Sequence, residues 1–126
     1  MIMSPLEIED VKVFTPDIYE DDRGYFFESF RANWLNADEF VQDNQSLSSK
    51  NTLRGLHYQL PNPQGKLVRV IKGAVFDVAV DLRRSSEYFG HWVGRTLTEE
   101  NREIFWVPPG FAHGFLVLTD HAEFVY

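Results

Sequence analysis

The sequence contains no cysteine, which excludes disulfide bonds and thiol chemistry. It also has no run of about 18 apolar residues, the length that a membrane-spanning helix needs. The first ten residues lack the basic region and apolar stretch that mark a secretory signal. These absences favour a cytoplasmic protein without a membrane segment, and a length of 126 residues predicts a single domain over residues 1–126.

Runs of basic residues are missing as well. The 12 lysines and arginines are outnumbered by 19 acidic residues, for a formal net charge of −7. We therefore expect no nucleic-acid partner. An anionic small ligand remains compatible with this charge, provided that a few arginines or lysines gather in a pocket.

Helical periodicity is weak, and only residues 30–40 and 98–105 are candidates for a short helix or a single turn. Short apolar and aromatic stretches that end at glycine or proline are abundant instead. They predict strands at 11–16, 24–30, 53–60, 66–73, 74–83, 91–98, 103–110, 114–120 and 122–126. Because strands and helices do not alternate, we predict an all-β sandwich or barrel.

The last predicted strand, residues 122–126, reads like the middle of a sheet. We therefore expect the sequence to be a C-terminally truncated portion of a longer protein. The alternative is a terminal strand that completes a sheet.

Residues 54–59 place an arginine, a histidine and a glutamine around a glycine. They form either an ordinary solvated strand or one wall of a concave site. His113 follows the turn at Pro108–Gly110 and lies either near a barrel mouth or in the core. Each stretch has one histidine and no well-placed carboxylate, whereas a catalytic metal needs three or four ligands, so we expect no metal site.

Asp77 and Asp81 lie an even number of residues apart and so share one face of their strand. If this face meets solvent, the two acids are surface groups; if it lines a barrel lumen, each charge needs a partner or a function. Taken alone, Lys66 is a surface lysine, Arg23 lies on a hairpin and residues 42–46 form a polar loop. On the strand that carries Asp77 and Asp81, the face opposite these two acids is apolar, with Phe76, Val78, Val80 and Leu82.

Five stretches together resemble one family, the dTDP-4-dehydrorhamnose 3,5-epimerases, which are cupin-like enzymes of dTDP-rhamnose synthesis. They are DDRGYFFESF (21–30), FVQDNQSLSSKNTLRGLHYQ (40–59), QGKLVRVIKGAVFDVAVDLRRSSEYFG (64–90), WVPPGFAHGFLVL (106–118) and AEFVY (122–126). They cover most of the sequence and occur in the family's order. The resemblance implies a cupin-type jelly-roll β-barrel with one or two short helices, a homodimer, and no metal or organic cofactor.

The reaction that the resemblance implies inverts C3 and C5 of a dTDP-linked 4-keto-6-deoxyhexose, two carbons next to a ketone. By resemblance, His57 removes the proton, Lys66 stabilises the enolate oxygen, and Tyr126 returns a proton to the opposite face. A histidine pKa of about 6.5 and a tyrosine pKa of about 10 suit these two roles at neutral pH.

Further residues match family positions that contact the substrate. Arg54 and Arg23 match contacts to the diphosphate, and Arg23 is expected to act across the dimer because the family exchanges N-terminal strands. The nucleotide-binding region is matched by Phe26, Glu28, Gln42 and Asn44. His113 matches a histidine that contacts substrate, and Asp77 matches a buried supporting acid.

The family pairs its catalytic histidine with an aspartate well beyond position 126, so we expect His57 to lack this orienting partner within the sequence. Three other functions remain open. The first is epimerisation of a single carbon of a related keto sugar, the second is an inactive sugar-nucleotide binding module, and the third is a metal-dependent cupin isomerase or oxygenase.

Overall fold

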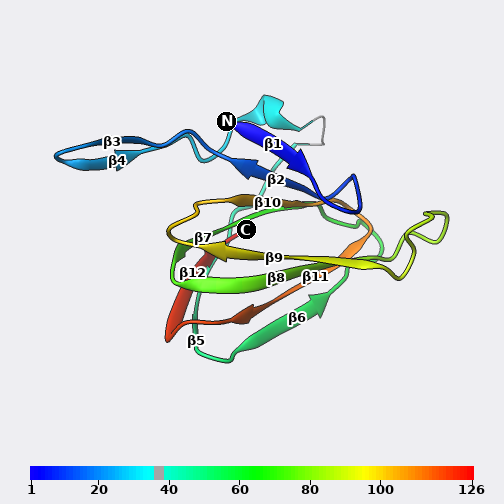
Figure 1. Cartoon of the computed structure of the whole chain (residues 1–126). Helices are drawn as coiled ribbons and strands as arrows, with labels where there is room; N and C mark the ends of the chain where they lie inside the picture. The colour runs from blue at the N-terminus through cyan, green and yellow to red at the C-terminus, as the bar shows by residue number, and fades with distance from the viewer. Residues whose placement is uncertain (36–38) are drawn as a thin grey trace.

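The computed structural model describes residues 1–35 and 39–126, and antiparallel strands make up nearly all of its regular structure (Figure 1). The strands are β1 (Ile2–Pro5), β2 (Lys12–Thr15), β3 (Tyr19–Asp21), β4 (Gly24–Phe26), β5 (Gln45–Ser49), β6 (Leu53–His57), β7 (Lys66–Lys72), β8 (Ala74–Asp81), β9 (Trp92–Thr98), β10 (Ile104–Val107), β11 (Phe111–Val117) and β12 (His121–Val125). The prediction of an all-β fold is thus confirmed.

Helical structure within the described residues is limited to one 3-10 turn, η1 (Ala32–Trp34). It lies inside the predicted stretch 30–40, whose residues 36–38 fall outside the described part. The second candidate, 98–105, is the end of β9, a turn at 99–101 and the start of β10. No described helix has the length and apolar character needed to cross a membrane.

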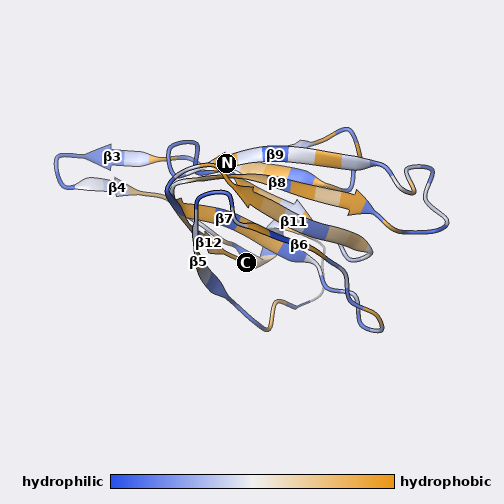
Figure 2. Ribbon diagram, turned by 90° about the horizontal axis from the view of Figure 1, so that it is seen from below, coloured by the Kyte–Doolittle hydropathy of each residue, from blue (hydrophilic) through white to orange (hydrophobic). Residues whose placement is uncertain are grey.

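The strands form two large sheets and a separate hairpin. One sheet has the order β1-β2-β10-β7-β12-β5 and the other β6-β11-β8-β9, while β3 and β4 pair only with each other. Figure 1 shows this hairpin projecting away from the two sheets. Figure 2 shows that β8 and β11 are largely hydrophobic, whereas the turn of the β3–β4 hairpin is polar.

The core lies between the two large sheets and draws on both. From the first sheet come Val68, Val70, Phe105 and Phe124, and from the second Val75, Leu97, Phe115 and Val117, all of them buried. Burial of such side chains is the main favourable term in folding.

Burial along β8 decides between the two interpretations of its acidic face. Asp77 and Asp81 are fully buried, whereas Phe76, Val78 and Val80 are only half-buried. The register explains this, because Asp77 pairs with Phe115 and Asp81 with Phe111. Side chains that pair across strands point to the same face, and both phenylalanines point into the core. The acidic face therefore lines the lumen, and the solvated interpretation is wrong.

Three strands were absent from the prediction: β1, β3 and β5. Residues 42–46 were predicted as a polar loop, but Gln45 and Ser46 begin β5, which pairs with β12 over Gln45–Ser49. A serine-rich segment has little intrinsic strand preference, so the pairing with β12 decides its conformation. In the opposite direction, the predicted strand 24–30 shortens to Gly24–Phe26.

Candidate active site

Two histidines lie side by side on neighbouring strands at one edge of the four-stranded sheet. His57 on β6 and His113 on β11 are register partners. Both line a cavity of about 240 Å³, here called the histidine cavity. Its remaining lining residues are Tyr58, Gln59, Pro63, Gln64, Lys66, Val107, Gly110 and Phe111. The structure thus brings together three of the predicted site residues, namely His57, Lys66 and His113.

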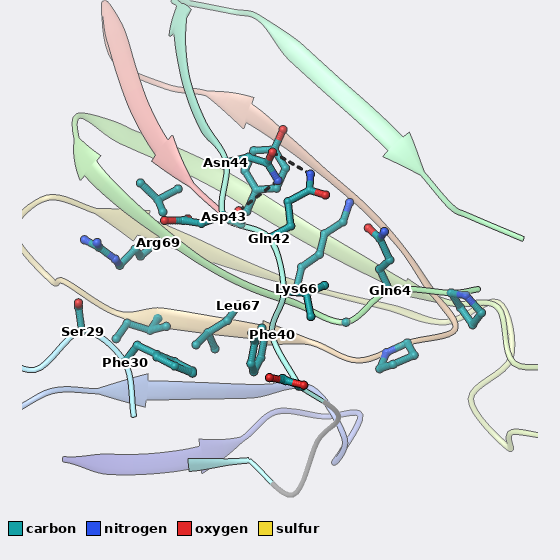
Figure 3. A pocket seen from close by; sticks show the side chains of 18 residues that line it. Ser29, Phe30, Phe40, Gln42, Asp43, Asn44, Gln64, Lys66, Leu67 and Arg69 are labelled. Atoms are coloured by element: carbon teal, nitrogen blue, oxygen red, sulfur yellow. Dashed lines mark hydrogen bonds between the residues drawn. The ribbon is translucent and has the colours of Figure 1, made fainter. Parts of the chain in front are cut away.

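A larger cleft of about 830 Å³, here called the tyrosine cleft, shares lining residues with the histidine cavity. Figure 3 shows the side chains that line this cleft. Tyr126, Gln42 and Asn44 line it, and Lys66 belongs to both spaces. The Lys66 ammonium lies 5.8 Å from the centroid of the Tyr126 ring. The predicted base and the predicted acid therefore line adjoining spaces, with the predicted cation between them.

His113 is held by a buried carboxylate. Its Nε2 lies 2.8 Å from Oδ1 and 3.0 Å from Oδ2 of Asp77, and both side chains are buried. A neutral imidazole in this position donates from Nε2–H to the carboxylate, which leaves Nδ1 as an acceptor. The Phe124 ring stacks on the His113 imidazole with a centroid distance of 6.2 Å, and this packing further restricts the ring.

Burial and charge shift the pKa values of Asp77 and Lys66 in opposite directions. Burial raises the pKa of Asp77, and the nearby His113 and Lys66 partly oppose this rise. Burial lowers the pKa of Lys66, and the negative charge of Asp77 partly restores it. The two groups therefore stabilise each other's charged form inside the barrel.

Asn44 fixes the position of Tyr126. The Asn44 backbone N–H donates to the Tyr126 backbone carbonyl at 2.7 Å, and the Tyr126 backbone N–H donates to the Asn44 backbone carbonyl at 3.0 Å. The Asn44 side chain is in turn engaged by Gln42, whose Nε2 donates to Asn44 Oδ1 at 3.0 Å. The Tyr126 ring packs on Phe124 with a centroid distance of 5.6 Å. The sequence pattern, which predicts a polar loop at residues 42–46, does not indicate this backbone pairing.

Arg54 spans the gap between the two large sheets. Its Nε donates to Ser48 Oγ at 2.8 Å, which links β6 to β5. Arg54 lines neither the histidine cavity nor the tyrosine cleft.

The remaining predicted substrate contacts lie apart from both spaces. The Arg23 side chain is 91 % exposed and binds Asp21 within the hairpin, and Phe26 is 69 % exposed. Phe26 and Glu28 line a different groove, together with Trp34. The structure therefore does not bring these three predicted residues next to His57 within one chain.

Arg102 holds the base of the β3–β4 hairpin, a contact that the sequence did not reveal. Its guanidinium carbon lies 4.0 Å from the centroid of the Tyr25 ring, and its Nη1 lies 3.9 Å from Glu20 Oε1. A cation stacked on an aromatic face is a recognised attraction. No local sequence pattern signals it, because 77 positions separate the two partners and the fold alone joins them.

Metal ligation finds no support in the described part of the chain, where no group of three His, Asp or Glu residues is arranged to hold an ion.

Comparison with known proteins identifies the family. The profile described as dTDP-4-dehydrorhamnose 3,5-epimerase matches residues 5–126. The dTDP-4-dehydrorhamnose 3,5-epimerase of Shigella flexneri is 57 % identical over 126 residues, covering 95 % of this chain and 70 % of that protein.

Solved structures give the same result. The dTDP-6-deoxy-D-glucose-3,5-epimerase of Legionella pneumophila, solved with dTDP-4-keto-L-rhamnose, superposes with a TM-score of 0.95 at 51 % identity, over 98 % of this chain and 69 % of that one. The 3'-monoepimerase ChmJ of Streptomyces bikiniensis, solved with dTDP-quinovose, is 33 % identical with a TM-score of 0.89, over 98 % of this chain and 65 % of that one. The predicted cupin-type jelly roll is thereby confirmed, and the chain belongs to the dTDP-4-dehydrorhamnose 3,5-epimerase family.

Proposed function

We propose that this domain, residues 1–126, carries the site that converts dTDP-4-dehydro-6-deoxy-D-glucose to dTDP-4-dehydro-L-rhamnose. The observation that carries the proposal is the placement of Lys66 between the histidine cavity, which contains His57, and the tyrosine cleft, which contains Tyr126. A sugar ring placed at Lys66 has an imidazole on one side and a phenol on the other.

Each residue has a distinct role in this proposal. His57 removes the proton from C3 or C5, since an unprotonated imidazole is a competent base near neutral pH. The electron pair moves onto the C4 oxygen, where the Lys66 ammonium stabilises the enolate. Tyr126 then delivers its phenolic proton to the opposite face of the carbon, which inverts the centre. His113 contacts the substrate, and Asp77 holds the His113 imidazole in place through its hydrogen bond to Nε2.

The proposed chemistry needs no cofactor. The ketone already acidifies both neighbouring C–H bonds, and the reaction moves protons without net oxidation or reduction. The requirement is a base, an acid on the other face and a stabilised oxyanion, which the three side chains supply.

The nucleotide is proposed to occupy the tyrosine cleft, where Gln42 and Asn44 present amide groups. Arg54, on the edge strand β6, is proposed to contact the diphosphate. The other proposed contacts, Arg23 to the diphosphate and Phe26 and Glu28 to the nucleotide, come from a second copy of the chain. The projection of the β3–β4 hairpin away from the two large sheets supports this exchange (Figure 1).

A homodimer is therefore part of the proposal. The outer face of the four-stranded sheet adds support, because Leu53, Leu116 and Trp92 are 70 %, 36 % and 60 % exposed. Leu116 pairs with both Leu53 and Phe76 in register, so these side chains form one apolar surface. We also propose a cytoplasmic location, which the absence of cysteine fits.

Incubation with the 4-keto substrate in D₂O tests the proposed reaction. Deuterium is expected at both C3 and C5 of the product, and label at one carbon would contradict the double epimerisation. His57→Ala should abolish exchange at both carbons and leave the Kd for thymidine diphosphate within about twofold, because the base does not contact the nucleotide.

A second candidate is epimerisation at a single carbon. The similarity to a 3'-monoepimerase at 33 % identity supports it. The same D₂O experiment separates the two candidates, since a monoepimerase introduces deuterium at one carbon only. Binding of thymidine diphosphate in calorimetry without any exchange would point instead to a sugar-nucleotide binding module.

A further inference from the structure

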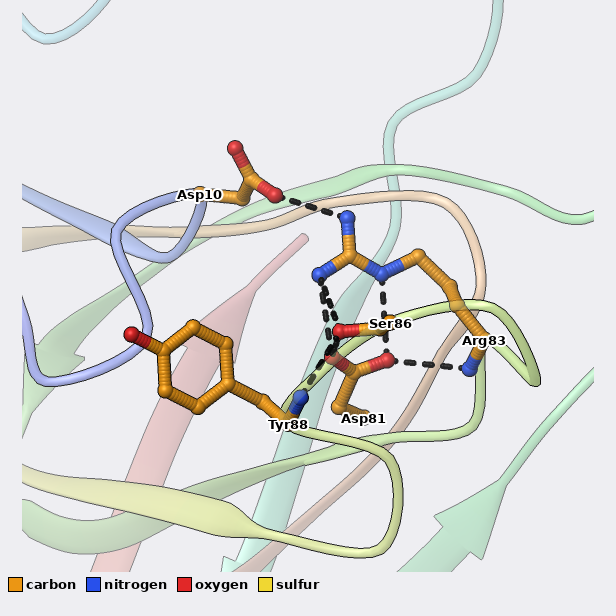
Figure 4. A network of polar contacts seen from close by, with 5 residues as sticks. All are labelled: Asp10, Asp81, Arg83, Ser86 and Tyr88. Atoms are coloured by element: carbon orange, nitrogen blue, oxygen red, sulfur yellow. Dashed lines mark hydrogen bonds and ion pairs between the residues drawn. The ribbon is translucent and has the colours of Figure 1, made fainter.

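A network of polar contacts outside both cavities centres on Asp81, the last residue of β8 (Figure 4). The Asp81 carboxylate is fully buried and accepts hydrogen bonds from Arg83 Nε at 3.0 Å, Arg83 Nη2 at 2.9 Å and Ser86 Oγ at 2.6 Å. Arg83 Nη1 donates to Asp10 in the β1–β2 loop at 2.7 Å. The guanidinium is therefore held on two sides by separate parts of the chain.

The same arginine packs against Gly110 and Phe111, which line the histidine cavity. Its guanidinium carbon lies 4.8 Å from the centroid of the Phe111 ring. A Cβ added at Gly110 would lie 2.7 Å from Arg83 Cγ, so the side chain passes directly over this glycine. The Leu82 N–H donates to the Gly110 carbonyl at 3.1 Å. Both Gly110 and Phe111 line the histidine cavity, whereas Arg83 does not.

We infer that Arg83 is a positioning residue for the active site: it holds the Gly110–Phe111 wall of the histidine cavity and, through it, the placement of His113 opposite His57. His113 follows Phe111 by two residues on the same strand, so a displaced turn displaces the imidazole. Where it concerns turnover, this inference rests on the proposed function.

Only arginine satisfies all of these contacts at once. Its planar guanidinium reaches both oxygens of Asp81 and still has a nitrogen for Asp10, and its flat face can stack on Phe111. A lysine in its place has a single nitrogen and cannot make this set of contacts. Arg83→Lys therefore keeps the charge and loses the geometry.

Arg95 provides a matched control. Its Nε and Nη2 donate to the two oxygens of Glu103, each at 2.7 Å, which is a forked ion pair of similar geometry. Arg95 lines neither the histidine cavity nor the tyrosine cleft. Arg95→Lys thus breaks a comparable pair without touching the cavity wall, and it reports what loss of stability alone does.

The experiment compares both variants with the parent protein at a temperature where all are folded. Arg83→Lys is expected to lower kcat about 10- to 100-fold, since small displacements in a catalytic site have effects of this size. Its Kd for thymidine diphosphate should stay within about twofold. Arg95→Lys should change neither quantity by more than about twofold. The imidazole NMR signals of His113 should shift in Arg83→Lys and stay in place in Arg95→Lys.

Equal losses of kcat in the two variants, or a folded Arg83→Lys protein with parental kcat and unshifted His113 signals, would overturn the inference. If Arg83→Lys does not fold, Ser86→Ala takes its place, because it removes one hydrogen bond to Asp81 and leaves the guanidinium. It should lower kcat severalfold and shift the His113 signals, and parental values for both would overturn the inference. If the parent protein shows no epimerisation, the proposed function fails, and the NMR signals alone decide on Arg83.

Discussion

Nε2 of His113 lies 2.8 Å from Oδ1 of Asp77, and both side chains are buried between the two sheets. Lys66 is near enough for its charge to lower the pKa of that carboxyl. The pair is therefore one part of a three-residue arrangement, in which one carboxylate orients an imidazole and stabilises an ammonium.

Asp77→Asn should shift the alkaline limb of the kcat–pH profile to lower pH. The carboxylate raises the pKa of Lys66 against the effect of burial, so its removal lets this pKa fall further. Lys66 then loses its proton at a lower pH, and the enolate loses its cation. Initial rates of epimerisation from pH 6 to 10 measure the shift, and an unchanged alkaline limb would exclude this coupling.

Tyr126→Phe should uncouple proton exchange from inversion. The phenyl ring can keep its packing on Phe124, which needs no hydroxyl. His57 can still remove a proton and return a deuteron to the same face, so exchange continues with retention. We expect a loss of epimerised product of at least about 100-fold with measurable deuterium in recovered substrate. Full epimerisation by the variant would show that another group is the acid.

The contribution of Asp81 to the stability of the folded protein should be lost at low pH. Burial acts to raise the pKa of Asp81, but hydrogen bonds from Arg83 and Ser86 outweigh it and lower this pKa to about 2. A carboxyl whose pKa is lower in the folded state contributes stability above its unfolded value near 4, and this contribution disappears as the pH falls toward 2. The loss should amount to about 2 kcal/mol of the free energy of unfolding.

Urea unfolding at pH 6, 4, 3 and 2 measures this contribution. Asp81→Asn serves as the comparison, because it cannot titrate and should show a correspondingly smaller loss over the same range. Parallel pH dependence of the two proteins would contradict the assignment to Asp81.

Removal of Arg102 should weaken nucleotide binding without changing the cavities. The guanidinium packs 4.0 Å from the Tyr25 ring centroid and so steadies the hairpin that is proposed to reach a second subunit. Arg102→Ala and Tyr25→Leu should each raise the Kd for thymidine diphosphate severalfold. In the double variant the effects should fall short of additive by about 0.5–1 kcal/mol. Calorimetry on the four proteins gives this coupling, and strict additivity would show that the contact does not act on binding.

Periodicity and the placement of glycine and proline were sufficient to predict β7, β8, β9 and β12, because each of these strands buries a side-chain pattern that is written locally. The motif around His57, together with Lys66, His113 and Tyr126, was likewise visible as residue types in a characteristic order. Local patterns failed for β5, whose serines acquire strand conformation only through hydrogen bonds to β12, far along the chain.

Residue order alone was enough to predict the all-β class, the family and the identities of the candidate catalytic groups. Alternation along β8 separated two faces but did not say which one is buried. Only the tertiary structure turned Asp77 and Asp81 inward, because their cross-strand partners Phe115 and Phe111 must fill the core. It also decided which contacts join distant segments, such as Arg102 with Tyr25 and Arg83 with Asp10, because such partners become neighbours only when the sheets assemble.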